Sequence, residues 1–335
     1  MDKKKPIIAI TMGDINGVGP EIIVKALMIQ NILQKANIII AGNLKAYNFY
    51  ANMLNFPIVP QRIKSPKDII SENLNLGITE LGYEDLPFEP GKLYPENSQA
   101  SADWIKNAVN WALEKQVRAI VTAPITKEGL AKANIPYDGH TTMLADLTRT
   151  KDYRMTLYAK GKWIVHHTAH LSLSEAIARV QLSSLIKTIQ ICYEYLRKIY
   201  STELQIAVAG LNPHAGENGL FGREEIEIIK PAIEECKRMG IPCTGPYPPD
   251  TVFRRLWLGE FNAVIAMYHD QGHIPLKLLA MDEGVNVTIG LPIIRTSVDH
   301  GTAFDIAGKG IASEKSLIEA INLAIELSNK MESIN

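Results

Sequence analysis

The sequence predicts an α/β protein with a largely parallel sheet, and three observations support this. Apolar runs rich in Ile, Val and Ala alternate with helical patterns along almost the whole chain. The 335 residues exceed what a single compact core usually holds, so we expect two domains. No internal repeat, low-complexity tract or long linker is present, so we expect the domains to pack closely with a cleft between them.

Local patterns predict the individual elements. Apolar, β-rich runs predict strands at Ile7–Thr11, Ile38–Ala41, Ala119–Thr122, Trp163–His167, Ile206–Ala209, Val264–Met267 and Val287–Ile289. Helical spacing predicts helices at Glu21–Gln34, Ser98–Lys115, Leu182–Lys198 and Arg223–Met239. The segment Phe56–Pro95 contains several Pro and Gly residues and no strong period, so we expect loops and short strands there.

Composition narrows the class of protein. The net charge of −1 gives no general attraction to nucleic acid or to an anionic membrane. No apolar run approaches the roughly 20 residues that span a bilayer, and the amino terminus lacks a cleavage pattern. Cys192, Cys236 and Cys243 have no metal-binding spacing and are interpreted as buried small hydrophobic residues. These features favour a cytoplasmic enzyme with a small-molecule substrate.

The segment GDINGVGPE, Gly13–Glu21, follows the first predicted strand and opens a helix. Its glycines allow a tight turn, and a helix amino terminus favours an anion. The G-x-G-x-x-G fingerprint of dinucleotide-binding domains occurs neither here nor elsewhere in the chain. On spacing alone, an ordinary strand-to-helix turn with Pro20 at the first helical position is the favoured interpretation.

All eight histidines lie between His140 and His300, and three of them follow predicted strands: His170, His214 and His269. The carboxyl ends of parallel strands meet at one edge of a sheet, where ligands bind. Three imidazoles gathered there would hold a metal ion with an open position for substrate. The alternative is that each is a hydrogen-bonded structural histidine, and spacing leaves the choice open. The adjacent His166 and His167 point to opposite faces of a strand and are interpreted as structural, as is His273.

Two carboxylates and one group of polar residues accompany these histidines. Asp270 and Asp250 are candidates for orienting the imidazoles, although Asp250 could equally cap a helix and Asp270 could form a loop salt bridge. A phosphate group requires Arg, Lys and short polar donors, and such side chains occur at His140, Thr141, Lys277, Asn286 and Arg295. Arg295 lies in an apolar, Gly-rich context where an unpaired guanidinium would be costly.

Several long strings resemble the motifs of the 4-hydroxythreonine-4-phosphate dehydrogenase family: GLNPHAGENG, AMYHDQGHIPLK, GVNVTIGLPIIRTSVDHGTAFDIAG, TAPITKEGL and YDGHTTM. The resemblance extends from the first strand to about Gly310. It implies the two-domain fold of isocitrate and isopropylmalate dehydrogenases, which bind NAD without a Rossmann fingerprint. The implied domains are an NAD-binding domain, residues 1–127 plus 285–335, and a metal-binding and dimerisation domain, residues 128–284.

The resemblance also assigns roles residue by residue. It implies metal ligands at His170, His214 and His269, with Zn²⁺ as the expected ion and Mg²⁺ or Co²⁺ as alternatives. It implies substrate contacts at His140, Thr141, Lys277, Asn286 and Arg295. Asp250 and Asp270 match the family's site-supporting aspartates, and Lys127 is the candidate general base. GDINGVGPE and HGTAFDIAGKG resemble cofactor loops, which implies NAD contacts at Gly13, Asp14, His300, Gly301, Thr302 and Asp305.

The implied reaction is oxidation of 4-phosphohydroxy-L-threonine by NAD⁺, with the metal acting as a Lewis acid on the C3 hydroxyl. The product, 2-amino-3-oxo-4-phosphooxybutanoate, loses CO₂ to give 3-amino-2-oxopropyl phosphate in pyridoxine 5'-phosphate biosynthesis. A branch of the family acts on D-threonate or D-erythronate 4-phosphate, which HDQGHIPLKLL and NGLFG resemble at least as closely. The resemblance further implies a homodimer with shared sites. Two other classes stay open, a non-catalytic phosphometabolite-binding protein and a phosphate acyltransferase.

Overall fold

The computed structural model describes residues 5–200 and 204–332, which fall into two compact units. The first unit takes the chain up to Lys151 and again from Leu291 onward, and the second is Asp152–Gly290. The sequence-based division set the boundaries after residues 127 and 284. Residues 128–151, which it assigned to the metal-binding domain, belong to the first unit, and residues 285–290, which it assigned to the NAD-binding domain, belong to the second. The first four and last three residues of that division lie outside the described part.

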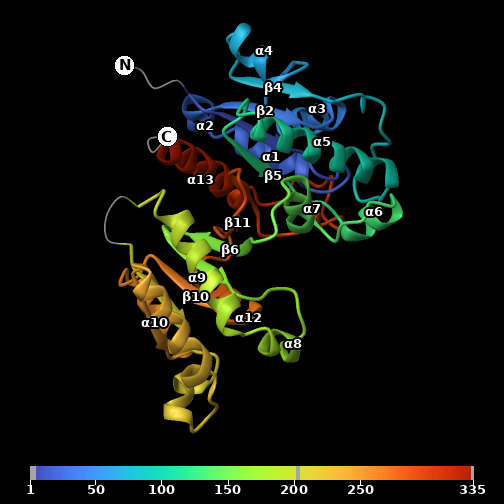
Figure 1. Cartoon of the computed structure of the whole chain (residues 1–335). Coiled ribbons are helices and arrows are strands. Elements are labelled where there is room, and N and C mark those ends of the chain that lie inside the picture. The colour runs from blue at the N-terminus through green and yellow to red at the C-terminus, as the bar shows by residue number, and fades with distance from the viewer. Residues whose placement is uncertain (1–4, 201–203, 333–335) are drawn as a thin grey trace. The chain divides into compact units, whose positions relative to one another are not determined.

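The first unit is built on six parallel strands in the order β3-β4-β2-β1-β5-β12 (Figure 1). The strands are β1 Ile7–Thr11, β2 Asn37–Ala41, β3 Gln61–Arg62, β4 Leu76–Thr79, β5 Ala119–Thr122 and β12 Arg295–Val298. The helices are α1 Gly19–Leu27, α2 Gln30–Lys35, α3 Leu44–Met53, α4 Pro66–Ser71, α5 Pro95–Leu113, α6 Lys127–Lys132, α7 His140–Leu147 and α13 Lys315–Glu332. Every residue of β1 and β5 is buried, as expected for central strands covered on both faces.

The second unit has a mixed sheet in the order β11-β6-β7-β10-β8-β9. Its strands are β6 Arg154–Ala159, β7 Lys162–His166, β8 Ile206–Ala209, β9 Cys243–Tyr247, β10 Ala263–Ala266 and β11 Val285–Ile289. Its helical segments are α8 Leu173–Ala178, α9 Leu182–Leu196, the 3₁₀ segment η1 Pro213–Gly219, the π-helical η2 Glu225–Ile229, α10 Lys230–Arg238, α11 Pro249–Trp257 and α12 His269–Ala280. The strands β11, β6 and β7 pair antiparallel, whereas β7, β10, β8 and β9 are parallel.

The predicted α/β class is confirmed, and all seven predicted strands are present. Their ends agree with the prediction within one residue, except that β11 begins at Val285 rather than at Val287. The single helix expected over Glu21–Gln34 is wrong, because the extended backbone of Ile29 separates α1 from α2. Short strands β3 and β4 occur between Phe56 and Pro95 as expected, but α4 in that segment was not predicted. The three cysteines are free and buried, as predicted.

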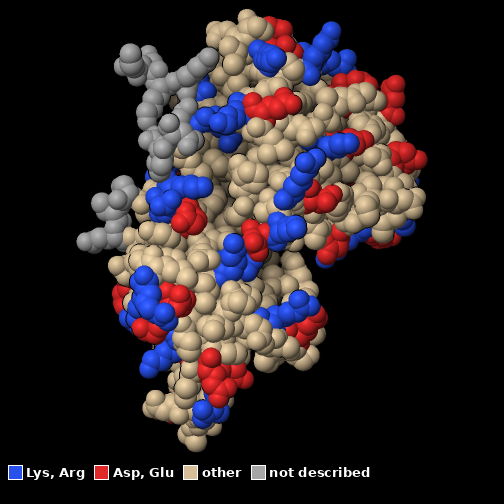
Figure 2. All heavy atoms as spheres, in the orientation of Figure 1, with Lys and Arg blue, Asp and Glu red and all other residues tan. Residues whose placement is uncertain are grey.

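Surface features agree with the composition. On the face shown in Figure 2, basic and acidic side chains are interspersed, which matches the net charge of −1. Among the described residues, no helix combines the length and the apolar character that crossing a membrane requires.

Candidate functional site

The three histidines singled out above all follow neighbouring parallel strands of the second unit. His170 lies in the loop after β7, His214 lies in η1 after β8, and His269 is the first residue of α12 after β10. Because β10 pairs with both β7 and β8, these loops leave the same edge of the sheet. The predicted placement at strand ends is therefore observed.

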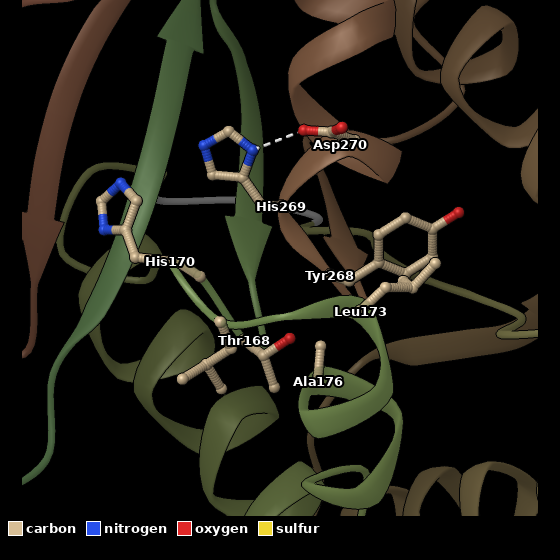
Figure 3. Close-up of a pocket in the computed structure, with 9 residues that line it drawn as sticks. Thr168, His170, Leu173, Ala176, Tyr268, His269 and Asp270 are labelled. Atoms are coloured by element: carbon tan, nitrogen blue, oxygen red, sulfur yellow. Dashed lines mark hydrogen bonds and ion pairs between the residues drawn. The ribbon is translucent and has the colours of Figure 1, made fainter.

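His170 and His269 come together at this edge, with their ring centroids 5.4 Å apart (Figure 3). The Nδ1 atom of His269 lies 2.7 Å from a carboxylate oxygen of Asp270, which fixes the ring and leaves Nε2 for a ligand. Both imidazoles border a pocket of about 360 Å³, which is lined by Thr168, Ala169, His170, Leu171, Leu173, Ala176, Tyr268, His269 and Asp270. The contact of Asp270 with His269 is the one that an orienting carboxylate would make.

A second histidine pair lies behind this one and was interpreted from sequence only as structural. The rings of His269 and His273 stack with centroids 3.6 Å apart and planes 10° apart. His273 Nδ1 is 3.1 Å from His166 Nε2, and both rings are buried. Burial lowers the pKa of His273 to about 4 and that of His166 to about 3, so both imidazoles are neutral at neutral pH. The sequence does carry a signal for the stack, because His269 and His273 are four residues apart on one helix face.

His214 does not join the His170–His269 pair in this structure. Within residues 5–200 and 204–332, no three His, Cys, Asp or Glu side chains gather closely enough to hold a metal ion. The exposed ring of His214 instead lies 6.1 Å from that of Phe221. The backbone of residues 214–218 is left-handed throughout, with φ between 41° and 78°. Each non-glycine residue in this conformation costs roughly 1–2 kcal/mol, so the turn must be held by its surroundings.

Asp250 is exposed in the first turn of α11, whose N-cap is Pro248. The alternative interpretation of Asp250 as an N-cap is therefore wrong, because Pro248 and Pro249 move the start of the helix upstream. A carboxylate in the first turn still favours the helix dipole.

In the first unit, the buried Arg295 and the half-buried His140 form a polar group. Arg295 is 3% exposed, and its Nη2 donates to Thr122 Oγ1 at 2.7 Å. Burial lowers the pKa of Arg295 to about 9. Burial and the charge of Arg295 lower the pKa of His140 well below its usual value, so its imidazole is neutral. His140 Nε2 is buried without a hydrogen-bond partner, which is the signature of a position that a ligand or water completes.

The other predicted substrate and catalytic residues divide between the units. Thr141 is half-buried at the start of α7 in the first unit, next to His140. Lys277 is exposed on α12 and Asn286 is half-buried on β11, both in the second unit. Lys127 is exposed at the start of α6 in the first unit.

The two segments expected to bind NAD lie against one another in the first unit. Val18 N donates to Thr302 O at 2.9 Å, and a Cβ on Gly17 would lie 2.9 Å from the same oxygen. Gly13 has φ of 68°, and a Cβ there would lie 2.1 Å from Pro124 O. Glycine is therefore required for the close approach of these loops. On either side of Thr302 in the second segment, His300, Gly301 and Asp305 are exposed.

Asp14 is the one buried carboxylate among these cofactor candidates. Its side chain is 1% exposed, Oδ1 accepts from Asn16 N at 3.0 Å, and Oδ2 has no partner. Burial raises the pKa of Asp14 to about 6, despite the opposing hydrogen bond from Asn16.

Known dehydrogenases resemble this chain over almost its whole length. The chain is 42% identical to the D-threonate 4-phosphate dehydrogenase of Cupriavidus necator, over 97% of this chain and 98% of that one. It is 42% identical to the enzyme of the same name from Pectobacterium atrosepticum, over 96% and 99%. The crystal structure of 4-hydroxythreonine-4-phosphate dehydrogenase from Klebsiella pneumoniae matches with a TM-score of 0.85 and 39% identity, over 98% and 99% of the two chains.

These similarities define the class first: the chain is a dehydrogenase, an oxidoreductase of the expected α/β class. The profile of one family, described as pyridoxal phosphate biosynthetic protein PdxA, matches residues 34–324. The chain belongs to this family. The acyltransferase and non-catalytic interpretations are thereby set aside.

Proposed function

We propose that the chain oxidises D-threonate 4-phosphate at C3, using NAD⁺ and a divalent metal ion. The observation that carries the proposal is the His170–His269 pair, oriented by Asp270 and open to a pocket. The name shared by the Cupriavidus and Pectobacterium relatives supports this substrate over the amino acid favoured by sequence alone. Hydride transfer gives NADH, a proton and a 3-oxo acid phosphate, which loses CO₂ readily.

The spacing of two of the three histidines, His170 and His269, fits a zinc ion. Two imidazoles bound tetrahedrally to one zinc, with Zn–N of about 2.0 Å, have ring centroids roughly 5 Å apart, and the observed separation is 5.4 Å. We propose His214 as the third ligand. When bound, the ion would supply Lewis-acid polarisation of the substrate hydroxyl groups.

The remaining roles fall to the chain's own side chains. Arg295 would hold the phosphate through its guanidinium fork, beside the neutral His140, with Thr141, Lys277 and Asn286 as further donors. The paired loops at Gly13–Asp14 and His300–Asp305 would bind NAD. Lys127 stays the candidate to accept the hydroxyl proton.

A second candidate substrate is 4-phosphohydroxy-L-threonine. The family description and the name of the Klebsiella structure favour it. The two substrates differ at C2, which carries a hydroxyl group in one and an amine in the other. Pocket discrimination between such groups is worth only about 1–3 kcal/mol unless a buried polar partner is left unpaired.

The deciding experiment is the measurement of kcat/KM for NADH formation from each compound with the same metal-loaded enzyme. We expect D-threonate 4-phosphate to be preferred by at least about tenfold, or roughly 1.4 kcal/mol. A tenfold preference for the amino substrate would assign the chain to pyridoxine 5'-phosphate biosynthesis. No NADH from either would refute both.

Metal dependence is tested separately. The His170→Ala variant should lose bound metal and most activity while its far-ultraviolet circular dichroism stays unchanged, because His170 is an exposed loop residue and not part of the core. Chelation of the native enzyme should also abolish turnover, with recovery on adding Zn²⁺, Mg²⁺ or Co²⁺. Full activity in a rigorously metal-free preparation would refute this part of the proposal.

We also propose a homodimer. In the arrangement that the family resemblance implies, His269 of one subunit would complete a site with His170 and His214 of the other, as the alternative to a site with the His170 of its own chain, whose ring centroid is 5.4 Å away. Support comes from large apolar side chains exposed on two helices of the histidine-bearing unit. Leu173 and Ile177 on α8 are 58% and 41% exposed, and Ile274 and Leu278 on α12 are 57% and 81% exposed. Exposed apolar surface of this kind is typical of a protein interface.

A further inference from the structure

The turn that carries His214 is strained, and a buried carboxylate lies directly beneath it. Glu225, the first residue of η2, is 3% exposed. Its Oε1 accepts hydrogen bonds from Leu211 N at 2.7 Å and Asn212 N at 2.8 Å. Its Oε2 accepts from Asn212 Nδ2 at 2.9 Å. These three bonds hold Leu211 and Asn212, which lie just before the left-handed turn at residues 214–218.

The chain is shaped to admit this carboxylate. A Cβ on Gly216, inside the turn, would lie 2.6 Å from Glu225 Oε2, and one on Gly210 would lie 3.1 Å from Oε1. A Cβ on Gly222 would lie 2.5 Å from Asn212 Nδ2. Two glycines thus leave room for the Glu225 carboxylate, and a third leaves room for its partner Asn212.

The start of the same loop is also bonded to the strand end that carries His269. Gln271 Nε2 donates to Gly210 O at 2.8 Å, and Gln271 Oε1 accepts from Met267 N at 2.7 Å. Gln271 is 8% exposed. The loop after β8 is thus held at Gly210 by Gln271, and at the next two residues by Glu225.

We propose that Glu225 is a positioning residue for the metal site: its carboxylate maintains the left-handed turn and so determines where the imidazole of His214, the proposed third ligand, lies. The inference rests on the proposed function, since it takes His214 as a ligand. Glu225 does not itself touch the ion or the substrate. A carboxylate is required because both oxygens act as acceptors, and the amide of glutamine would direct N–H groups at one set of donors.

The test compares Glu225→Gln with Glu227→Gln, an exposed glutamate of the same π-helical segment that pairs with Arg223. The dissociation constant for Zn²⁺ is measured by chelator competition on the metal-free full-length protein, and the visible absorption of the Co²⁺ form reports ligand geometry. We expect Glu225→Gln to weaken Zn²⁺ binding by about 10- to 100-fold and to alter the Co²⁺ spectrum. Glu227→Gln should match the native protein in both.

The double variant with His214→Ala separates positioning from general destabilisation. If Glu225 acts through His214, the Glu225→Gln change should weaken Zn²⁺ binding no further once His214 is gone. Additive losses, or native affinity in Glu225→Gln while His214→Ala binds weakly, would overturn the inference. Native affinity in His214→Ala would instead refute the ligand assignment of the proposed function.

Should Glu225→Gln fail to fold, Gly216→Ala disturbs the same contact from the other side, because its Cβ would meet Glu225 Oε2. Weaker Zn²⁺ binding by a folded Gly216→Ala protein supports the inference. Native affinity there overturns it.

Discussion

Arg295 is the side chain on which the proposed phosphate recognition depends most. It is buried on β12, and both Nε and Nη2 bond to Thr122. An ammonium group cannot reproduce that planar fork. Arg295→Lys should therefore lower kcat/KM for the phosphorylated substrate on the order of 100-fold, or roughly 3 kcal/mol. The exposed Arg149→Lys serves as the matched control, and an unchanged preference for phosphorylated over unphosphorylated substrate in Arg295→Lys would contradict the assignment.

Asp14 gives a prediction that depends on pH. Its folded-state pKa of about 6 exceeds the ordinary value of 3.8, so the folded state disfavours ionisation. The resulting loss of stability is absent below pH 3.8, develops between pH 3.8 and 6, and is complete above pH 6. Asp14→Asn should thus raise the free energy of unfolding by about 1–3 kcal/mol at pH 7.5 and much less at pH 4.5.

Urea denaturation at the two pH values measures this difference. If Asp14 contacts NAD, the same variant should show a higher KM for NAD⁺, so stability would be gained as function is lost. Equal stabilisation at both pH values would show that ionisation of Asp14 is not the cause.

At the scale of elements, α1 anchors the end of the second segment proposed to bind NAD. Lys25 Nζ donates to Gly310 O at 3.0 Å and Ala312 O at 2.6 Å, and pairs with the fully buried Glu21 at 2.8 Å. Lys25→Met should release this loop and leave the buried Glu21 carboxylate without its cation, which costs about 3 kcal/mol of stability. The KM for NAD⁺ should rise several-fold while metal affinity stays unchanged. The exposed Lys35→Met is the control, and a native KM in Lys25→Met would contradict the anchoring role.

Strands were more predictable than helix boundaries, for physical reasons visible at particular residues. β1 and β5 are uninterrupted apolar runs because both faces are buried, so their sequences alone identify them. The break between α1 and α2 at Ile29 contains no Gly or Pro, so nothing in the sequence signals it. By contrast, α4 could have been found, since Ser65, Pro66 and Asp68 form a capping box with proline in the first turn.

The candidate site was predictable to a similar extent. Strand-end placement of the three histidines follows from the βα pattern, but the approach of His170 to His269 depends on backbone conformation, including the positive φ of His170. The left-handed turn at 214–218 could not be predicted, because His214, Ala215 and Glu217 have no intrinsic preference for it. The contacts that surround it, including those of Glu225 and Gln271 with the start of the loop, are tertiary.

At the scale of the whole molecule, shared sites predict recovery of activity between two inactive variants. In a hybrid of His214→Ala and His269→Ala subunits, one site regains all three histidines and the other loses two. Mixing equal amounts through reversible dissociation should restore up to about a quarter of native activity, because half of the dimers are hybrids with one good site each. Native mass spectrometry would verify hybrid formation. Proven hybrids without activity would favour a site contained within one chain.

The division of the chain into a continuous and a discontinuous unit sets the order in which the protein can mature on the ribosome. The unit Asp152–Gly290 is complete once its last strand β11 has emerged. The first 151 residues emerge earlier, yet β5 must wait for β12 to pair with it and for α13 to pack against both. Until translation reaches Val298, the nascent chain carries an open strand edge, which is a template for aggregation. The part synthesised first is therefore the part that finishes folding last.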